Sequence, residues 1–94
     1  MASFVATILR IEAESNAEEA CVPIEAGTLA QAQKQAAVVI KEMPRGLGWR
    51  SYTDTKLWGK EQRVLVDVVS QDEFASRSET QTEHEARLRK AAKV

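Results

Sequence analysis

With 94 residues the chain has room for one domain, and a domain of this length buries only about 60 to 65% of the surface that its unfolded form exposes. Apolar residues make up 44% and charged residues 29%, which is the balance of a folded protein and excludes an intrinsically disordered chain. The net charge of −1 excludes the strongly basic surface that is typical of proteins that coat nucleic acids.

The single cysteine, Cys21, cannot form an internal disulfide, and the chain starts with no apolar run of signal-peptide length. We therefore expect a reducing, cytoplasmic environment. No segment of 18 apolar residues is present, so the sequence also predicts no membrane span.

The first predicted element is a strand from Ser3 to Glu14, which is apolar on both faces at its start and alternates with charged residues toward its end. A short edge strand is expected at Ala20 to Ile24, in a hairpin with the first, because Pro23 cannot donate to a ladder and suits an edge. In the alternative interpretation, residues 17–20 form a helical turn and residues 22–26 form a loop.

A helix is predicted from Thr28 to Met43. Thr28 and Gln31 have the spacing of a capping box, which satisfies backbone donors at a helix start, and Pro44 ends the helix. One stripe at helical spacing is apolar and is expected to face a sheet, namely Leu29, Ala32, Ala36, Val39, Ile40 and Met43.

Two further strands are predicted over residues 48–55 and 62–70, joined as a hairpin in which Gly59 allows the tight turn. The second strand has the highest valine density in the chain, so we expect it at the centre of the sheet. Simple alternation places Val64, Val66 and Val68 on one face and Leu65, Asp67 and Val69 on the other.

Ser70 and Glu73 form a second capping box, which predicts a helix from Gln71, and Thr80 with Glu83 can cap a renewed helix. Beyond residue 75 the apolar stripe fades. We therefore assign residues 1–75 to a globular domain and residues 76–94 to a helical tail that protrudes or frays unless another chain covers it.

The tail is acidic in its first half and basic in its second half. Antiparallel pairing of residues 79–93 with a second copy would match opposite charges, so a homodimer through this segment is one hypothesis. The alternative is a lone solvated helix with internal ion pairs.

These elements give an α+β domain in ββαββα order, with helices on one side of a small mixed or antiparallel sheet. The element order resembles that of the β-grasp, the ubiquitin-like layout, and the resemblance implies nothing about function. If the strand at residues 20–24 is absent, a βαββα two-layer sandwich is the alternative.

Motifs for catalysis or metal binding are lacking. Cys21 and His84 are single copies, and a nucleophilic pair would require contact between them and a third group that orients the histidine. A buried thiol and an exposed helix histidine explain the same residues. No set of residues has the spacing of a zinc site, so the sequence predicts no enzyme, no metal and no cofactor.

One candidate binding surface lies in residues 45–63, which hold both tryptophans, the one tyrosine, and five basic against two acidic side chains. Trp49 and Tyr52 point to opposite faces of a strand, so one of them is expected to face solvent or a partner, and the sequence leaves open which. Exposed Trp, Tyr and Arg dominate interface energetics. The predicted partner-binding residues are Arg45, Trp49, Arg50, Tyr52, Lys56, Trp58, Lys60 and Arg63.

We therefore expect a small non-enzymatic interaction and regulatory module that occupies a surface of a larger protein, as phage-encoded modulators and inhibitors of host machinery do. One alternative is a module that binds single-stranded or structured nucleic acid, because Trp and Tyr stack on bases beside phosphate-binding arginines. A small enzyme that uses Cys21 and His84 is a second alternative. In a third, the aromatic residues have only a structural role and Trp49 fills the core.

Overall fold

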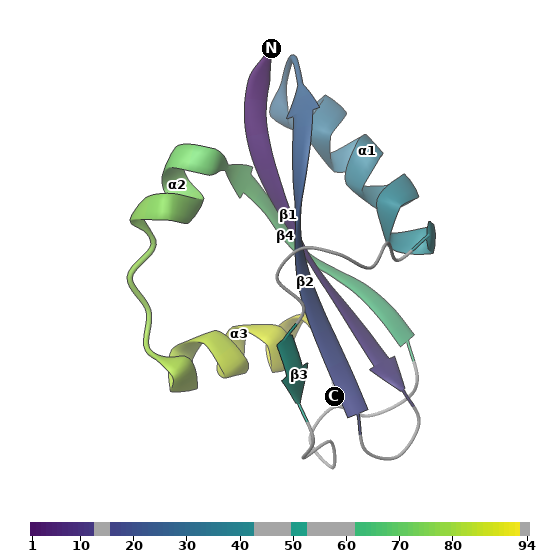
Figure 1. The fold of residues 1–94 in the computed structure, drawn as a ribbon, viewed down its shortest axis with the longest axis vertical. Helices are drawn as coiled ribbons and strands as arrows, with labels where there is room; N and C mark the ends of the chain where they lie inside the picture. Colours follow the sequence, from purple (N-terminus) through teal and green to yellow (C-terminus); the bar gives the residue numbers. More distant parts are fainter. Residues whose placement is uncertain (13–15, 43–49, 53–61, 93–94) are drawn as a thin grey trace.

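The computed structural model describes residues 1–12, 16–42, 50–52 and 62–92, and every structural statement below refers to these residues. Their order is ββαββα, with the final helical part divided in two, and this confirms the predicted α+β class and element order (Figure 1). The elements are β1 Ala2–Glu12, β2 Asn16–Ala26, α1 Leu29–Glu42, β3 Arg50–Tyr52, β4 Gln62–Ser70, α2 Gln71–Ser76 and α3 Gln81–Ala92.

The four strands form one sheet in the order β3-β2-β1-β4, and every pairing is antiparallel. β1 pairs with β2 along its whole length, so the predicted hairpin is confirmed and is longer than expected. The helical turn at residues 17–20 and the βαββα sandwich are therefore excluded. Pro23 fits this place, because β3 covers β2 only from Ala17 to Glu19.

β3 and β4 lie at opposite edges of the sheet, so the predicted hairpin between them is wrong, and so is the central position of β4. β1 is central instead. Its residues Phe4–Leu9 are buried, because apolar side chains on both faces allow it to be covered from both sides. β4 pairs only with β1 among the described strands, and all its residues except Arg63 are half-buried.

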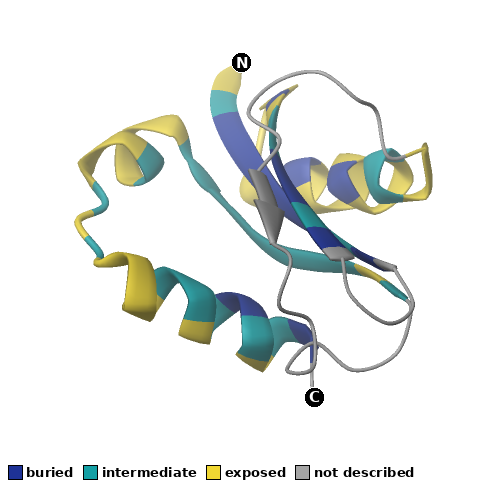
Figure 2. Ribbon diagram, turned by 60° about the horizontal axis from the view of Figure 1, so that its bottom comes forward, coloured by how far each residue is buried: buried dark blue, intermediate teal, exposed yellow. Residues whose placement is uncertain are grey.

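The helices lie on both faces of the sheet, not on one side as predicted (Figure 1). On one face, Ala32 and Ala36 of α1 pack in the cluster that contains Phe4 and Ala6 of β1. On the opposite face, Leu88 and Ala92 of α3 pack in a second cluster. Its other members are Leu9 and Ile11 of β1 and Ala17 of β2. Figure 2 shows both contacts as buried bands on the helices.

The apolar stripe of α1 is confirmed in its middle and is wrong at its start. Ala32 and Ala36 are fully buried and Val39 and Ile40 are half-buried, whereas Leu29 is 46% exposed. The capping box forms as predicted, since Thr28 Oγ1 accepts from the Gln31 backbone N–H at 3.2 Å. The small alanines let the helix approach the sheet closely.

A β-bulge divides β4. Thr7 of β1 is opposite Asp67 and Ile8 is opposite Leu65, so β4 carries one extra residue, Val66, at this point. Leu65 therefore packs on the α1 side with Val68, while Val66 packs on the α3 side. The predicted alternation along this strand is wrong, because the bulge changes which face each later residue points to.

The C-terminal helix does not protrude. Leu88 of α3 has no exposed surface, Ala92 is 1% exposed, and the Ala92 carbonyl accepts a hydrogen bond from the Gln62 side chain of β4 at 3.0 Å. The cap predicted at Thr80 forms in both directions, with distances of 3.1 and 3.2 Å to Glu83. None of the helices in the described part of the chain has the length and apolar character needed to cross a membrane.

Candidate functional site

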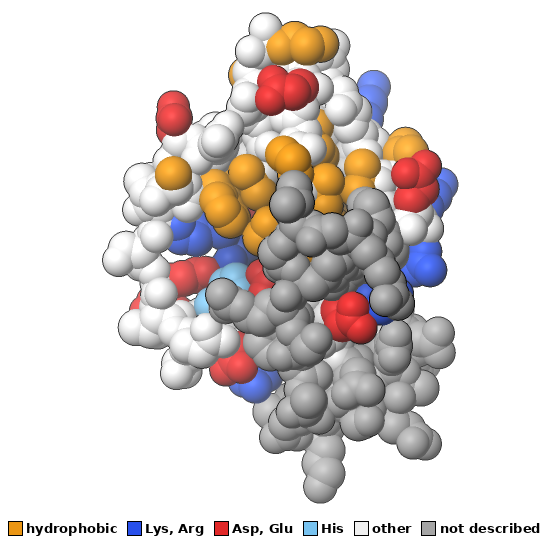
Figure 3. All heavy atoms as spheres, in the orientation of Figure 1, with side chains coloured by type: hydrophobic (Ala, Val, Ile, Leu, Met, Phe, Trp, Pro, Cys, Tyr) orange, Lys and Arg blue, Asp and Glu red, His pale blue; other side chains and the backbone are white. Residues whose placement is uncertain are grey.

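A polar pocket of about 330 Å³ lies between the α3 side of the sheet and the segment that runs from α2 to α3. The space-filling view shows basic, acidic and histidine side chains gathered beside one another on this part of the surface (Figure 3). The lining residues are Glu19, Cys21, Phe74, Arg77, Glu79, Gln81, His84 and Arg87. We call this the α3-side pocket.

Strand geometry places the floor of the pocket. Glu19 and Cys21 are two residues apart on β2 and so point to the same face, and Thr7 of β1 is the pairing partner of Cys21. Thr7 is also opposite Asp67, so the bulge in β4 brings that carboxylate to the same face as Glu19. Glu19 is 3% exposed and Thr7 is 1% exposed, which makes the floor both polar and buried.

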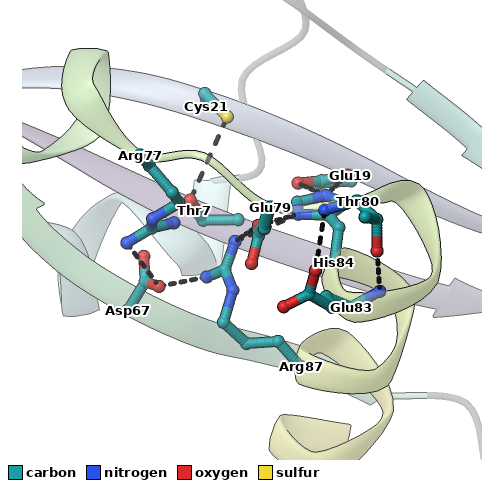
Figure 4. A network of polar contacts seen from close by, with 10 residues as sticks. All are labelled: Thr7, Glu19, Cys21, Asp67, Arg77, Glu79, Thr80, Glu83, His84 and Arg87. Carbon is teal, nitrogen blue, oxygen red and sulfur yellow. Dashed lines mark hydrogen bonds and ion pairs between the residues drawn. The ribbon is translucent and has the colours of Figure 1, made fainter.

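Two arginines converge on Asp67 (Figure 4). Arg77, at the end of α2, places Nη2 3.4 Å from Asp67 Oδ2, and Arg87 of α3 donates through Nη1 to the same oxygen. Arg87 also donates through Nη2 to Glu79 Oε1 at 2.9 Å. These contacts tie β4, the end of α2, the α2–α3 connection and α3 together.

His84 extends this network to β2. Its Nε2 lies 2.8 and 2.9 Å from the two carboxylate oxygens of Glu19, and its Nδ1 lies 2.7 Å from Glu79 Oε1. Arg87 Nη2 is 3.0 Å from the same Nδ1. Both ring nitrogens are thus occupied by residues of the chain.

The network is not fully satisfied. Asp67 Oδ1, Arg77 Nη1 and Arg87 Nε are buried atoms without a hydrogen-bond partner among the described residues. Buried polar atoms of this kind are usually met by ordered water in a polar cavity, and the α3-side pocket is large enough to hold several water molecules.

Mutual charges set the protonation of the pocket. The hydrogen bond from Arg87 lowers the pKa of Glu79 to about 2, against the smaller opposing effect of burial. Burial opposes the charge of Arg87, but the hydrogen bond to Glu79 and the charge of Asp67 outweigh it and raise the pKa of Arg87. Both groups are therefore ionised across the ordinary pH range.

Cys21 and His84, considered above as a nucleophilic pair, do not contact each other in any hydrogen bond given by the described residues. Both residues line the α3-side pocket, but the contacts of His84 go to carboxylates and to Arg87, and Cys21 Sγ lies 4.0 Å from Thr7 Oγ1. A general base needs a ring nitrogen that can reach a substrate proton. Among the described residues no group of three or more His, Cys, Asp or Glu is placed to hold a metal ion.

Most of the predicted partner-binding surface lies outside the described residues. This holds for Arg45, Trp49, Lys56, Trp58 and Lys60. Arg50 and Tyr52 belong to β3 and Arg63 to β4, at opposite edges of the sheet and three strand spacings apart, or about 14 Å. The described members of the set therefore do not share an edge.

Of the residues that line the α3-side pocket, the sequence pointed to Cys21 and His84 and missed the others. One signal was available in Asp67, a carboxylate within a strand of valines, because a charged residue in an apolar strand requires a partner. The partners could not be identified from spacing, since Arg87 lies twenty residues away and Glu19 is 65 residues from His84.

No protein family, curated protein or solved structure matches this chain.

Proposed function

We propose that the protein is a small non-enzymatic interaction module that binds a larger protein along the outer edge of β4. The observation that supports this proposal is the character of that edge: nine residues, rich in valine, paired with β1 on one side and with no other described strand. An unpaired strand edge offers backbone N–H and C=O groups to which an extended segment of another protein can add.

The two edges of the sheet differ in how well they are protected. β3 has three residues, and a short edge strand pairs poorly with other chains. β4 has no proline, its one acidic side chain turns toward Arg77 and Arg87, and its apolar side chains stay half-exposed. An added strand would cover them, so the edge has both the backbone and the apolar surface that a partner requires.

The bulge limits the shape of such a contact. Regular pairing to a partner is expected over Gln62–Leu65 or over Asp67–Ser70, rather than through Val66. Arg63, one of the predicted partner-binding residues, is exposed and lies in the first of these two segments. The nucleic-acid alternative has less support, because Arg50 and Arg63 do not lie on one edge.

The contacts of His84 and Arg87 within the α3-side pocket support the non-enzymatic part of the proposal. His84 has both ring nitrogens engaged, and Arg87 donates to two carboxylates, so these groups act on one another. A cytoplasmic location, expected from the single Cys21, and an inhibitory or regulatory action on the partner belong to the same proposal.

The experiment first captures the partner and then compares charge reversals at the two edges of the sheet. A photo-crosslinking amino acid at Arg63, in the source cell, is expected to capture a partner, while the same amino acid at Lys34, on the outer side of α1, does not. With that partner in hand, Arg63→Glu is expected to weaken binding about tenfold, and Arg50→Glu to leave it unchanged. Arg63→Glu also removes the hydrogen bond that Arg63 donates to the Lys41 carbonyl of α1, so its free energy of unfolding is measured beside its binding and is expected to fall by about 1 kcal/mol.

Hydrogen exchange gives an independent measurement. Roughly half of the β4 amides point away from β1 in an antiparallel ladder, and these are expected to gain protection only when the partner is bound. Weakening by Arg50→Glu alone would place the contact at the β3 edge, and equal binding by both variants without new protection in β4 would refute strand addition.

A further inference from the structure

His84 holds together parts of the chain that are distant in sequence. Its Nε2 contacts Glu19 of β2 at 2.8 and 2.9 Å, and its Nδ1 contacts Glu79 of the α2–α3 connection at 2.7 Å. A carboxylate oxygen only accepts hydrogen bonds. Both contacts are therefore hydrogen bonds only when both ring nitrogens carry protons, which is the cationic form of histidine.

The carboxylates around His84 match its cationic form, whereas Arg87 Nη2, 3.0 Å from Nδ1, opposes it. The groups that face it are Glu19 and Cys21 from β2, Asp67 from β4, Arg77 from the end of α2, Glu79 from the connection and Arg87 from α3. The carboxylates outnumber the arginines by one in this set. The proton on His84 balances the network, and its loss leaves an excess negative charge beside the buried Glu19.

Loss of that proton removes the hydrogen bond from Nδ1 to Glu79 and allows Nδ1 to accept one from Arg87. If Nε2 keeps its hydrogen for Glu19, the lone pair of Nδ1 faces the Glu79 oxygen at 2.7 Å, and the two repel each other. Arg87 Nη2, 3.0 Å from Nδ1, can then donate to the ring instead of to Glu79. Glu79 loses its hydrogen bond from histidine and shares its arginine.

We propose that His84 is a proton-operated latch between β2, the start of α3 and the preceding connection. When it loses its proton, the contact to Glu79 breaks and the hydrogen bond to Glu19 loses its charge, so that both segments are held less firmly on β2. The latch consists of His84, Glu19, Glu79 and Arg87. The end of α3 is held separately, because Leu88 and Ala92 are buried in the apolar core. Release therefore loosens residues 79–87 and widens the α3-side pocket, while the last turn of α3 stays in place.

The direction of the pH dependence follows from these charges. Glu79 stays ionised down to about pH 2, so the latch remains closed in mildly acidic solution. It opens as the pH rises and His84 deprotonates. The measurements therefore run from mildly acidic to mildly alkaline solution.

The test uses the fact that His84 is the one histidine in the chain. Nitrogen-15 NMR of its ring reports protonation and tautomer without ambiguity, and amide exchange is followed in the same samples. Protection factors, which are corrected for the intrinsic effect of pH, are expected to fall about tenfold for Glu83–Arg87 as the ring deprotonates, because one charge-assisted hydrogen bond is lost. Those of Leu88–Ala92 are expected to stay constant.

Two variants and one control separate the latch from general charge effects. His84→Gln is expected to make the exchange of residues 83–87 independent of pH, and Glu19→Gln, which leaves the contact of Nδ1 to Glu79, is expected to reduce the pH response. Glu18→Gln removes the same charge from the same strand, but Glu18 pairs with Arg10 rather than with His84, so the wild-type pH response is expected to persist. If one latch variant fails to fold, the other gives the same comparison.

Three results would overturn the latch. His84 could keep its proton over the whole range, or it could lose the proton with no change in the exchange of residues 83–87. A pH response abolished equally by Glu18→Gln would show that net charge, and not this site, controls the helix.

Discussion

Asp67 shows how a single carboxylate organises one side of this molecule. It lies in an otherwise apolar stretch of β4, half-buried, and receives both Arg77 and Arg87 on one oxygen. Removing it would leave two guanidinium groups near the sheet without their shared partner, which costs more than the ion pairs themselves contribute. The carboxylate is thus tolerated in the strand because the arginines of two later segments, the end of α2 and α3, pair with it.

Acid sensitivity is predicted at Glu79. Its pKa is lowered from 4.5 to about 2 in the folded protein, chiefly by the hydrogen bond from Arg87, so its ionised form stabilises the fold. That contribution is complete above pH 4.5 and is lost as the pH falls toward 2. The side chain is reached by solvent, and screening reduces the effect to about 0.5 to 1 kcal/mol.

Urea unfolding at a series of acidic pH values measures this contribution. The wild type is expected to lose about 0.5 to 1 kcal/mol more than Glu79→Gln over the window from pH 4.5 to 2, because the variant has no proton to bind there. Parallel curves for the two proteins would show that Glu79 contributes nothing through its charge.

At the scale of elements, different contacts hold the two ends of α3 on the sheet. Its final turns are held by apolar contacts of Leu88 and Ala92, while its start is held by polar contacts and by the Thr80 cap. The helix is otherwise strongly polar, so these few contacts decide whether it stays on the sheet.

Loss of the Thr80 cap is predicted to destabilise α3 specifically. Thr80→Ala removes the acceptor for the Glu83 backbone N–H and should cost about 1 kcal/mol. Thr82→Ala is the matched control, because Thr82 is exposed, lies inside the helix and has no described contact, and alanine is the better helix former there. Denaturant unfolding and the helical signal in circular dichroism measure both variants, and equal stability of the two would contradict the role of the cap.

At the scale of the whole molecule, one sheet carries helices on both faces, and β1 is the part that both helices share. It pairs on both sides and supplies buried residues to the α1 cluster and to the α3 cluster. β3, in contrast, has three residues and a single partner. Local stability is therefore expected to decrease from β1 toward the edges.

Amide exchange should follow that order. The amides of β1 and of the facing part of β2 are expected to open only with global unfolding, and those of β3 and α2 to exchange orders of magnitude faster, because few contacts hold them. Measurement by NMR at one pH and temperature suffices. Equal protection of β3 and β1 would show that the edge is held by contacts beyond the pairing to β2.

The part of this fold that could be predicted from sequence is the local part. The caps at Thr28, Ser70 and Thr80 and the first hairpin depend on residues close in the chain, and the structure confirms them. The placement of β3 beside β2, and of β4 beside β1, depends on contacts between distant segments, which alternation does not report.

Most of the candidate site could not be predicted, because it also depends on contacts between distant segments and because residues 45–63 gave a stronger signal elsewhere. Its groups come from β2, β4, α2, the α2–α3 connection and α3, and they meet because of contacts between distant segments, the strand order and the bulge. The aromatic and basic residues at 45–63 gave a stronger signal in composition, but composition says nothing about whether residues share a surface. Arg50 and Arg63 illustrate this, because the fold sends them to opposite edges.

The bulge has a consequence for how the length of β4 can change. Nine residues of β4, Gln62–Ser70, span the length that eight residues of β1 fill, and Val66 is the surplus one. Deleting Val66 would leave Leu65 and Asp67 on the faces that they already occupy, at the loss of one packed valine. A residue inserted elsewhere in the strand has no such allowance, since it would turn either the apolar side chains or Asp67 to the wrong face. Val66 thus marks the position where a deletion in this strand is tolerated.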